Sequence, residues 1–235
     1  MKAVILAGGR GTRLAPYTTV FPKPLVPIDD RPIVDIILEQ LSRHGFTNVT
    51  ISLGHLGHLI KAYYATGDGH GLTIDYVTEK DPLGTAGSLA LIQGLDSTFL
   101  VMNGDILTTL EYRALIEHHR SSGAALTIAG HVKEVSIDLG VLEIGDGGLL
   151  TGYREKPVET FPVSMGIYVY EPRMMRHLVP GEYLDFPALV LRALAAGEKI
   201  SVCRSDALWL DIGRREDYEE AQRLFCEKRE QFLGA

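Results

Sequence analysis

The sequence predicts an α/β fold in which a mainly parallel or mixed sheet is flanked by helices on both faces. Residues 3–6 form a short apolar run without alternation, which is typical of a central parallel strand buried on both faces. Strand and helix patterns then alternate along the first half of the chain, as in βαβ folds. With 235 residues, of which 46% are hydrophobic, the chain can bury a sizeable core.

The first half contains four predicted strands, each followed by a helix. Asp29 and Asp30 precede Pro32 at a predicted helix start, and apolar residues then recur at helical spacing until Gly45. We expect strands at residues 3–6, 49–53, 72–77 and 98–102, and helices at 33–41, 60–64, 88–93 and 109–119.

The second half is less regular. We expect strands at residues 124–129, 140–144, 149–154, 164–170, 200–202 and 207–210, and helices at 172–178, 186–195 and 215–232. On the last helix Tyr218, Ala221, Leu224 and Phe225 lie at helical spacing. Core packing is the first interpretation of these four positions, and a contact between two copies in a homodimer is the second. No linker or repeat interrupts the chain, so we expect one domain over 1–235, with a nucleotide-binding half (about 1–122) and an acceptor-binding half (about 123–235).

The charge balance restricts the partners. The 23 basic and 30 acidic residues give a net charge of −7, and no long basic run is present, which argues against nucleic acid. No apolar run reaches about 18 residues, so we expect a cytoplasmic protein without a membrane partner. Cys203 and Cys226 are too few for a disulfide framework or a cysteine-type zinc site. The eight histidines show no metal-like spacing, and we interpret them as surface or helix residues.

A glycine-rich segment follows the first strand directly. Its close backbone approach and amide groups are suited to phosphate oxygens, although a tight turn at the strand exit is the alternative. Neither the Walker pattern nor the dinucleotide fingerprint fits, since Leu14 stands where the latter needs a glycine. Lys23 lies between Pro22 and Pro24, on a stiffened backbone that orients it toward the same crevice. The candidate nucleotide-binding residues in this part of the chain are Leu6, Ala7, Gly8, Gly9, Gly11, Thr12, Arg13 and Lys23.

Two aspartates follow predicted strands. Asp105 and Asp211 would both lie at the carboxyl edge of the sheet, where ligands bind in open α/β folds. Each alone could also be a turn or capping residue. Together they indicate a Mg²⁺ site, because Mg²⁺ is often held by one or two carboxylates plus substrate phosphates and water. Glu155 and Lys156 are less specific, and an exposed ion pair is their alternative interpretation.

These motifs resemble the signature of sugar-1-phosphate nucleotidylyltransferases, in the order found in that family. The resemblance rests on residues 6–14, 21–27, 79–87, 101–105, 153–157 and 209–213. It implies a Rossmann-like, glycosyltransferase-A-like nucleotidyltransferase fold. It also implies a Mg²⁺-dependent reaction of a nucleoside triphosphate with a sugar 1-phosphate, which gives a nucleotide sugar and pyrophosphate.

The resemblance also assigns roles to residues. It implies that Arg13 and Lys23 are catalytic and that Asp105 and Asp211 hold the metal. Further nucleotide-binding residues are then Gly84, Thr85, Ala86, Asn103 and Gly104. The sugar-phosphate residues are Gly140, Glu155, Lys156, Ser164 and Gly166, where Ser164 replaces an asparagine of many relatives.

The motif residues 82–87 and 23–27 look most similar to mannose-1-phosphate guanylyltransferases. Pro24 stands where thymidylyl relatives usually have glutamine. We therefore expect GTP as the nucleotide and a hexose or heptose 1-phosphate as the acceptor. Uridylyl, cytidylyl or thymidylyl transfer in the same family is an alternative, and so is a non-catalytic nucleotide-sugar-binding relative. The failed dinucleotide fingerprint makes an oxidoreductase the least favoured reading.

Overall fold

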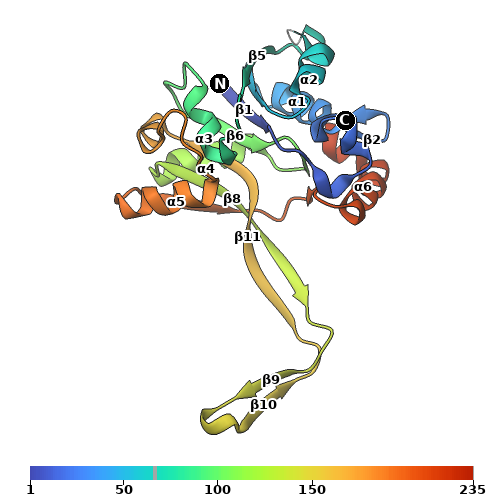
Figure 1. The fold of residues 1–235 in the computed structure, drawn as a ribbon, viewed down its shortest axis with the longest axis vertical. Coiled ribbons are helices and arrows are strands. Elements are labelled where there is room, and N and C mark those ends of the chain that lie inside the picture. The colour runs from blue at the N-terminus through green and yellow to red at the C-terminus, as the bar shows by residue number, and fades with distance from the viewer. Residues whose placement is uncertain (66–67, 235) are drawn as a thin grey trace.

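A seven-stranded mixed sheet forms the centre of the protein in the computed structural model, which describes residues 1–65 and 68–234. Its strands, in spatial order, are β12 (Ile200–Arg204), β8 (Leu126–Ser136), β11 (Val158–Tyr170), β6 (Phe99–Asn103), β1 (Lys2–Ala7), β4 (Asn48–Leu53) and β5 (Thr73–Thr78). β1, β4, β5 and β6 run parallel, whereas β11 is antiparallel to both of its neighbours. The predicted mainly parallel, mixed sheet is confirmed (Figure 1).

Helices cover both faces of the sheet. The larger core lies beneath α1 (Ile33–Arg43), α2 (Gly57–Tyr64), α4 (Tyr112–Ser122) and α6 (Arg215–Leu233). The smaller core lies beneath α3 (Gly84–Gly87), the 3-10 helices η5 (Ser88–Leu91) and η7 (Pro172–His177), and α5 (Phe186–Ala195). Side chains of β1 alternate between the two cores: Ala3 and Ile5 belong to the larger one and Val4 to the smaller one.

Short elements complete the chain. The two-stranded ladders are β2 (Pro27–Ile28) with β3 (Arg31–Pro32), β7 (Ile106–Thr108) with β13 (Trp209–Asp211), and β9 (Val141–Ile144) with β10 (Leu150–Arg154). The remaining 3-10 helices are η1 (Thr12–Leu14), η2 (Tyr17–Thr19), η3 (Lys23–Leu25), η4 (Asp68–His70) and η6 (Asp146–Gly148). No helix among residues 1–65 and 68–234 combines the length and apolarity needed to cross a membrane.

A buried polar network fixes the larger core. Gln40 of α1 donates hydrogen bonds to the carbonyl oxygens of Thr108 (2.8 Å) and Phe232 (2.9 Å), and it accepts one from the hydroxyl of Tyr112 (3.0 Å). A satisfied buried amide of this kind holds its neighbours in one arrangement. Ala221 and Phe225 of α6 are fully buried, so core packing of this helix is confirmed.

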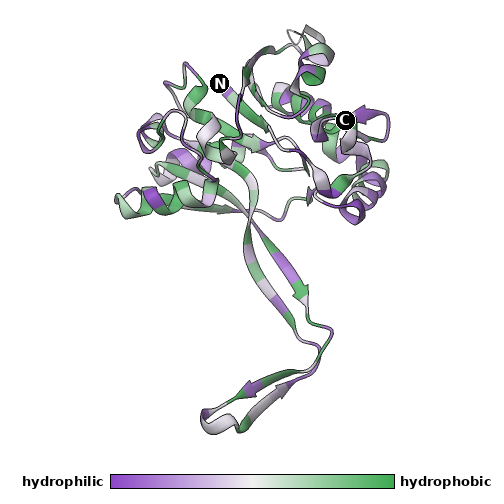
Figure 2. Cartoon of the chain, in the orientation of Figure 1, coloured by the Kyte–Doolittle hydropathy of each residue, from purple (hydrophilic) through white to green (hydrophobic). Residues whose placement is uncertain are grey.

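Beyond Gly130 and Ser164, strands β8 and β11 leave the body of the molecule as a two-stranded ladder. We call residues 132–163 the arm, which ends in the β9–β10 hairpin (Figure 1). Along the arm, hydrophobic and hydrophilic residues alternate without a covering layer (Figure 2). Its exposed large apolar side chains are Val132, Val135, Leu139, Leu142, Ile144, Leu149, Leu150, Tyr153, Val158 and Phe161.

The predicted ends of several elements were wrong, and the helix expected at 172–178 is the 3-10 helix η7. The strands expected at 124–129 and 164–170 extend into the arm, to Ser136 and from Val158. Both faces of the arm are exposed, so the one-sided apolar pattern that marks a half-buried strand is missing there. The helix expected at 88–93 is the 3-10 turn η5 preceded by α3, and it ends where Ile92 adopts an extended backbone.

Candidate functional site

The site forms where parallel strands end. β1 and β6 lie side by side, so the glycine-rich segment after Ala7 and the segment after Asn103 leave the sheet at one edge. The amide of Gly104 donates a hydrogen bond to the carbonyl oxygen of Leu6 (2.9 Å), which holds the two segments together. Because β11 is antiparallel to β6, the arm starts from this same edge.

The ladder of β7 and β13 brings the two aspartates together. Asp211 lies opposite Ile106 in this ladder, and the amide of Ile212 donates to the carbonyl oxygen of Asp105 (3.1 Å). Two carboxylates 106 residues apart in sequence therefore share one edge of the sheet, as the sequence predicted.

Lys23 lies between these carboxylates. Its ammonium group bonds Oδ2 of Asp105 and lies 4.0 Å from Oδ1 of Asp211. The preceding loop is folded on itself, since Thr18 donates to the carbonyl oxygen of Gly11 (2.7 Å). Gly11 has a φ of 62°, and a β-carbon there would lie 3.1 Å from that of Lys23, so a larger residue would displace the lysine.

The electrostatics of the pair fit a cation. Partial burial, followed by the neighbouring carboxylate of Asp105, raises the pKa of Asp211 above its ordinary value. Oδ1 of Asp105 is buried and has no hydrogen-bond partner among the described residues. Such an oxygen requires an explanation, and an unseen ion is one. The described part of the chain holds no group of three or more metal-binding side chains.

A cavity of about 280 Å³ adjoins Asp105. Its predicted lining residues are Leu6, Gly8, Gly9, Gly84, Thr85 and Asn103. Ala7, Lys23 and Gly104 line a small hollow beside it. Gly11 and Thr12 form the start of the 3-10 turn η1, and Ala86 is fully buried, so these three residues do not line the cavity. The sequence thus predicted most of this wall.

Five lining residues were not predicted: Glu79, Pro82, Ser88, Tyr183 and Asp185. Glu79 accepts the amide of Leu83 (2.9 Å) and the carboxylate of Asp185 accepts the hydroxyl of Tyr183 (2.8 Å). Tyr183 and Asp185 come from a loop about a hundred residues away, where an aspartate before a helix looks like an ordinary cap. Glu79 lies within the motif at residues 79–87, and nothing else in the sequence indicates that it lines the cavity.

That distant loop approaches the segment 84–87 very closely. The amides of Ala86 and Gly87 both donate to the carbonyl oxygen of Leu184 (2.9 Å each). Gly84 has a φ of 77°, and a β-carbon there would lie 2.6 Å from the same oxygen. Only glycine fits this position without a backbone shift.

Arg13 lies on the other side of the aspartates. It lines a separate hollow with Asp211, Gly213, Arg214 and the first residues of the arm. Two cations therefore lie near the carboxylates: Lys23 at both of them, and Arg13 in the hollow that Asp211 also lines.

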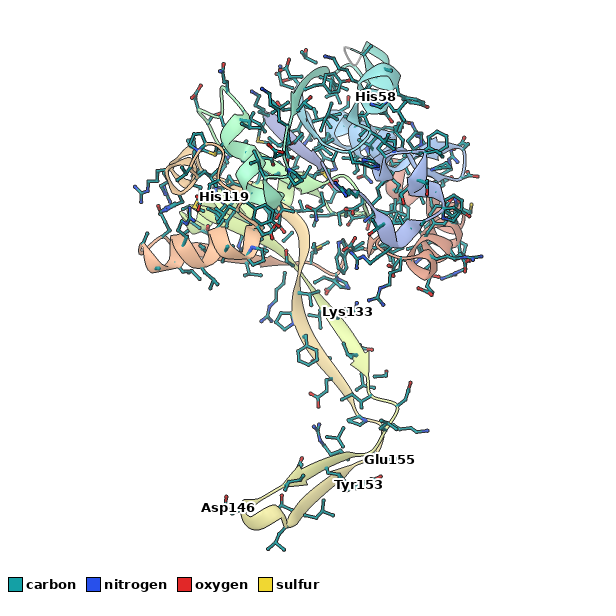
Figure 3. All side chains as sticks on the ribbon, in the orientation of Figure 1. His58, His119, Lys133, Asp146, Tyr153 and Glu155 are labelled. Carbon is teal, nitrogen blue, oxygen red and sulfur yellow. The ribbon has the colours of Figure 1, made fainter. Side chains whose placement is uncertain are left out.

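The structure divides the predicted sugar-phosphate residues into two groups. Ser164 and Gly166 lie in the body, where a β-carbon on Gly166 would be 2.8 Å from the amide nitrogen of Asn103. Gly140, Glu155 and Lys156 lie on the arm and do not join the carboxylates of their own chain. Figure 3 shows Tyr153 and Glu155 far from the body, beyond Lys133.

Comparison with known proteins agrees with this geometry. A family model described as nucleotidyl transferase matches residues 2–228. A UTP–glucose-1-phosphate uridylyltransferase from Synechocystis is 34% identical, with 95% of this chain and 63% of that protein covered. A D-glycero-alpha-D-manno-heptose 1-phosphate guanylyltransferase from Aneurinibacillus thermoaerophilus is 30% identical, with 95% and 97% covered.

Solved structures show the same fold. HddC from Yersinia pseudotuberculosis has a TM-score of 0.74 at 27% identity, with 95% of this chain and 99% of that chain covered. The complex of that protein with GMP-PN has a TM-score of 0.72. The chain spans about 63% of the length of the Synechocystis relative and 62% of a mannose-1-phosphate guanylyltransferase from Mycobacterium tuberculosis. From residue 2 to residue 228, this chain belongs to the nucleotidyl transferase family.

Proposed function

We propose that this protein is a sugar-1-phosphate guanylyltransferase, which converts GTP and a hexose or heptose 1-phosphate into a nucleotide sugar and pyrophosphate. One observation supports this most strongly: Asp105, Asp211 and Lys23 converge beside the glycine-lined cavity at the carboxyl edge of the sheet. This is where open α/β sheets bind their ligands.

The residues fit a magnesium ion, and the clearest sign is Oδ1 of Asp105, which is buried and has no hydrogen-bond partner in the described part of the chain. Asp105 and Asp211 would hold it. When bound, such an ion neutralises phosphate charge and contributes several kcal/mol of charge stabilisation. Lys23 contacts both carboxylates and would turn toward phosphate oxygens once a cation balances them.

The reaction needs no protein nucleophile. An oxygen of the sugar phosphate attacks the α-phosphorus, the bond from that phosphorus to the bridging oxygen breaks, and pyrophosphate leaves with the electron pair. The protein then contributes position and charge. We assign Lys23 and Arg13 to the triphosphate and the leaving pyrophosphate, and Lys156 to the attacking phosphate.

Two observations favour guanine over the other bases. The carboxylates of Glu79 and Asp185 line the cavity and act as hydrogen-bond acceptors. Guanine presents two adjacent kinds of N–H donor on one edge, whereas uracil and thymine present a single N–H. In addition, a relative that this chain covers almost completely is named a heptose 1-phosphate guanylyltransferase.

The test is a matrix of GTP, UTP, CTP and dTTP against mannose, glucose and manno-heptose 1-phosphates, with pyrophosphate release as the signal. We expect the highest kcat/KM with GTP. A higher value with UTP for every sugar phosphate would assign the chain to uridylyl transfer, the activity named for its 34% identical relative. Binding of nucleotide sugars without any pyrophosphate release would indicate a non-catalytic relative.

A further inference from the structure

The arm holds most of the uncovered apolar surface of this protein. Among the described residues, ten of the nineteen exposed large hydrophobic side chains lie between residues 132 and 163. Leu139 and Leu149 are 73% and 72% exposed. A two-stranded hairpin is marginally stable in water by itself, and an extended apolar surface of this kind marks an interaction site. The arm therefore requires a covering surface.

The arm makes its bonds internally. The amide of Ile137 donates to the carbonyl oxygen of Pro157 (3.0 Å), the hydroxyl of Tyr153 donates to Glu155 (3.1 Å), and Arg154 donates to Glu159 (2.7 Å). The ladder from Ser164 opposite Gly130 to Val158 opposite Ser136 has no shift in register. It is a continuous ladder.

This ladder keeps Lys156 away from the site of its own chain. Six residue steps separate Ser164 from Val158, which is about 20 Å of strand at roughly 3.3 Å per residue. Lys156 lies two residues further out, beyond the reach of a lysine side chain. To place it beside Asp105 of the same chain, the outer ladder would have to break or swing as a whole.

Exposed apolar side chains also lie in the segment before Lys23 and at the cavity. Val20 and Phe21 precede Lys23 and are 62% and 53% exposed, and Tyr17 is exposed beside them. Tyr183, at the cavity, is 60% exposed. Exposed apolar side chains thus lie in the loop that leads to Lys23 and at the cavity wall.

We propose that two copies of this chain exchange arms, so that Glu155 and Lys156 of each copy complete the site of the other. The proposal rests on the function proposed above, because that function assigns the sugar phosphate to these two residues. Two-fold symmetry completes the sites of both chains at once. Each arm reaches the site of the other copy, and the outer ladder of each arm stays intact.

Mixing two inactive variants tests the exchange. Asp105→Asn disables the body and Lys156→Glu disables the arm, since a carboxylate repels the sugar phosphate. Random pairing after co-expression makes about half of the dimers mixed, and each mixed dimer has one intact site. We expect about one quarter of wild-type pyrophosphate release per chain, measured below saturation with sugar phosphate. No recovery, with mixed dimers isolated through two different affinity tags, would show that each arm serves its own chain and would overturn the proposal.

A matched control places both changes on one chain. Mixed with equal wild type, the Asp105→Asn, Lys156→Glu chain should lower the activity per wild-type chain to about one half, because mixed dimers then hold no intact site. Unchanged activity per wild-type chain in isolated mixed dimers contradicts the exchange.

A second readout is independent of catalysis. In sedimentation equilibrium, Leu142→Ser with Leu150→Ser on the arm should weaken dimerisation at least tenfold. Leu191→Ser with Leu194→Ser, equally exposed on α5, should leave it unchanged. A wild-type chain that is monomeric at its assay concentration overturns the proposal. If the wild type dimerises through the arm yet releases no pyrophosphate, the proposed function fails and the arm-mediated dimer stands.

Discussion

The body and the arm of this protein are built in opposite ways. In the body, strands such as β1 are covered on both faces, and Ala3, Val4 and Ile5 have no exposed surface. In the arm, two strands pair only with each other, and Leu139 and Leu149 are largely exposed. The body therefore fixes Asp105 and Asp211 by its own packing, whereas the position of Lys156 depends on what covers the arm.

The largest expected contrast is in folding stability. Phe225→Ala removes a fully buried ring from α6 and should lower the free energy of unfolding by about 3–5 kcal/mol. Phe161→Ala on the arm, where the ring is half exposed, should cost less than about 0.5 kcal/mol in dilute protein. Urea unfolding at two protein concentrations measures both, and a loss in Phe161→Ala that grows with concentration belongs to association. Equal losses in dilute protein would remove the distinction between body and arm.

The next contrast concerns catalysis. Asp105→Asn and Asp211→Asn should each lower kcat by at least about a hundredfold, roughly 2.7 kcal/mol, while the thermal midpoint changes little. The amide keeps the size of the side chain and removes its charge. Asp206→Asn, which lies outside the site, is the matched control. Near-normal turnover at saturating Mg²⁺ in either site variant refutes the metal assignment.

Substrate dependence separates the cations of the two regions. Lys156→Ala should raise the KM for the sugar 1-phosphate about tenfold, roughly 1.4 kcal/mol, and leave the KM for GTP close to normal. Arg13→Ala should act on GTP and, in the reverse direction, on pyrophosphate. Initial rates with each substrate varied in turn give the answer. The division of roles is wrong if both variants change the KM of the same substrate only.

The smallest contrast is a pH dependence inside the body. Burial lowers the pKa of His119, whose ring nitrogens bond Thr127 (2.8 Å) and Glu171 (3.0 Å). The unfolded chain then binds a proton that the folded chain does not, so the free energy of unfolding falls as pH drops below about 6.5.

In His119→Gln this slope should be shallower between pH 7 and pH 5, measured by urea unfolding. Part of the slope should remain, because burial also lowers the pKa of His44. The exposed His58, marked with His119 in Figure 3, supplies the control His58→Gln, which should match wild type. An unchanged slope in His119→Gln contradicts the assignment.

Local patterns predicted the body well. The apolar run of β1 and the helical repeat of α1 each indicate burial directly. Asp105 was selected as a candidate from the strand before it, and Lys23 from the prolines on either side of it. The same local view placed His119 on a helix but missed its burial. Its partner Glu171 lies 52 residues away, and no spacing in the sequence reveals that contact.

In the arm, the end strands expected at 140–144 and 149–154 are present as β9 and β10, but the long ladder that carries them escaped prediction. Val132, Val135, Val158 and Phe161 are good strand residues, but an uncovered ladder does not need them on one face only. The motif that contains Glu155 and Lys156 implied a role for them but not their location on the arm. Tyr183 and Asp185 were missed because a cavity wall built by a distant loop has no local signature.

The free edges of the arm expose unpaired backbone groups. A two-stranded ladder leaves outward N–H and C=O groups that could pair with further chains and grow without end. Here Pro162, opposite Val132, and Pro157 lack the N–H such growth needs, and Lys133, Glu134 and Glu159 place charges along the same strands. Strand addition is thereby discouraged while the apolar faces stay available. Chains of this design can associate through the faces of their arms into an oligomer of fixed size, even at high protein concentration.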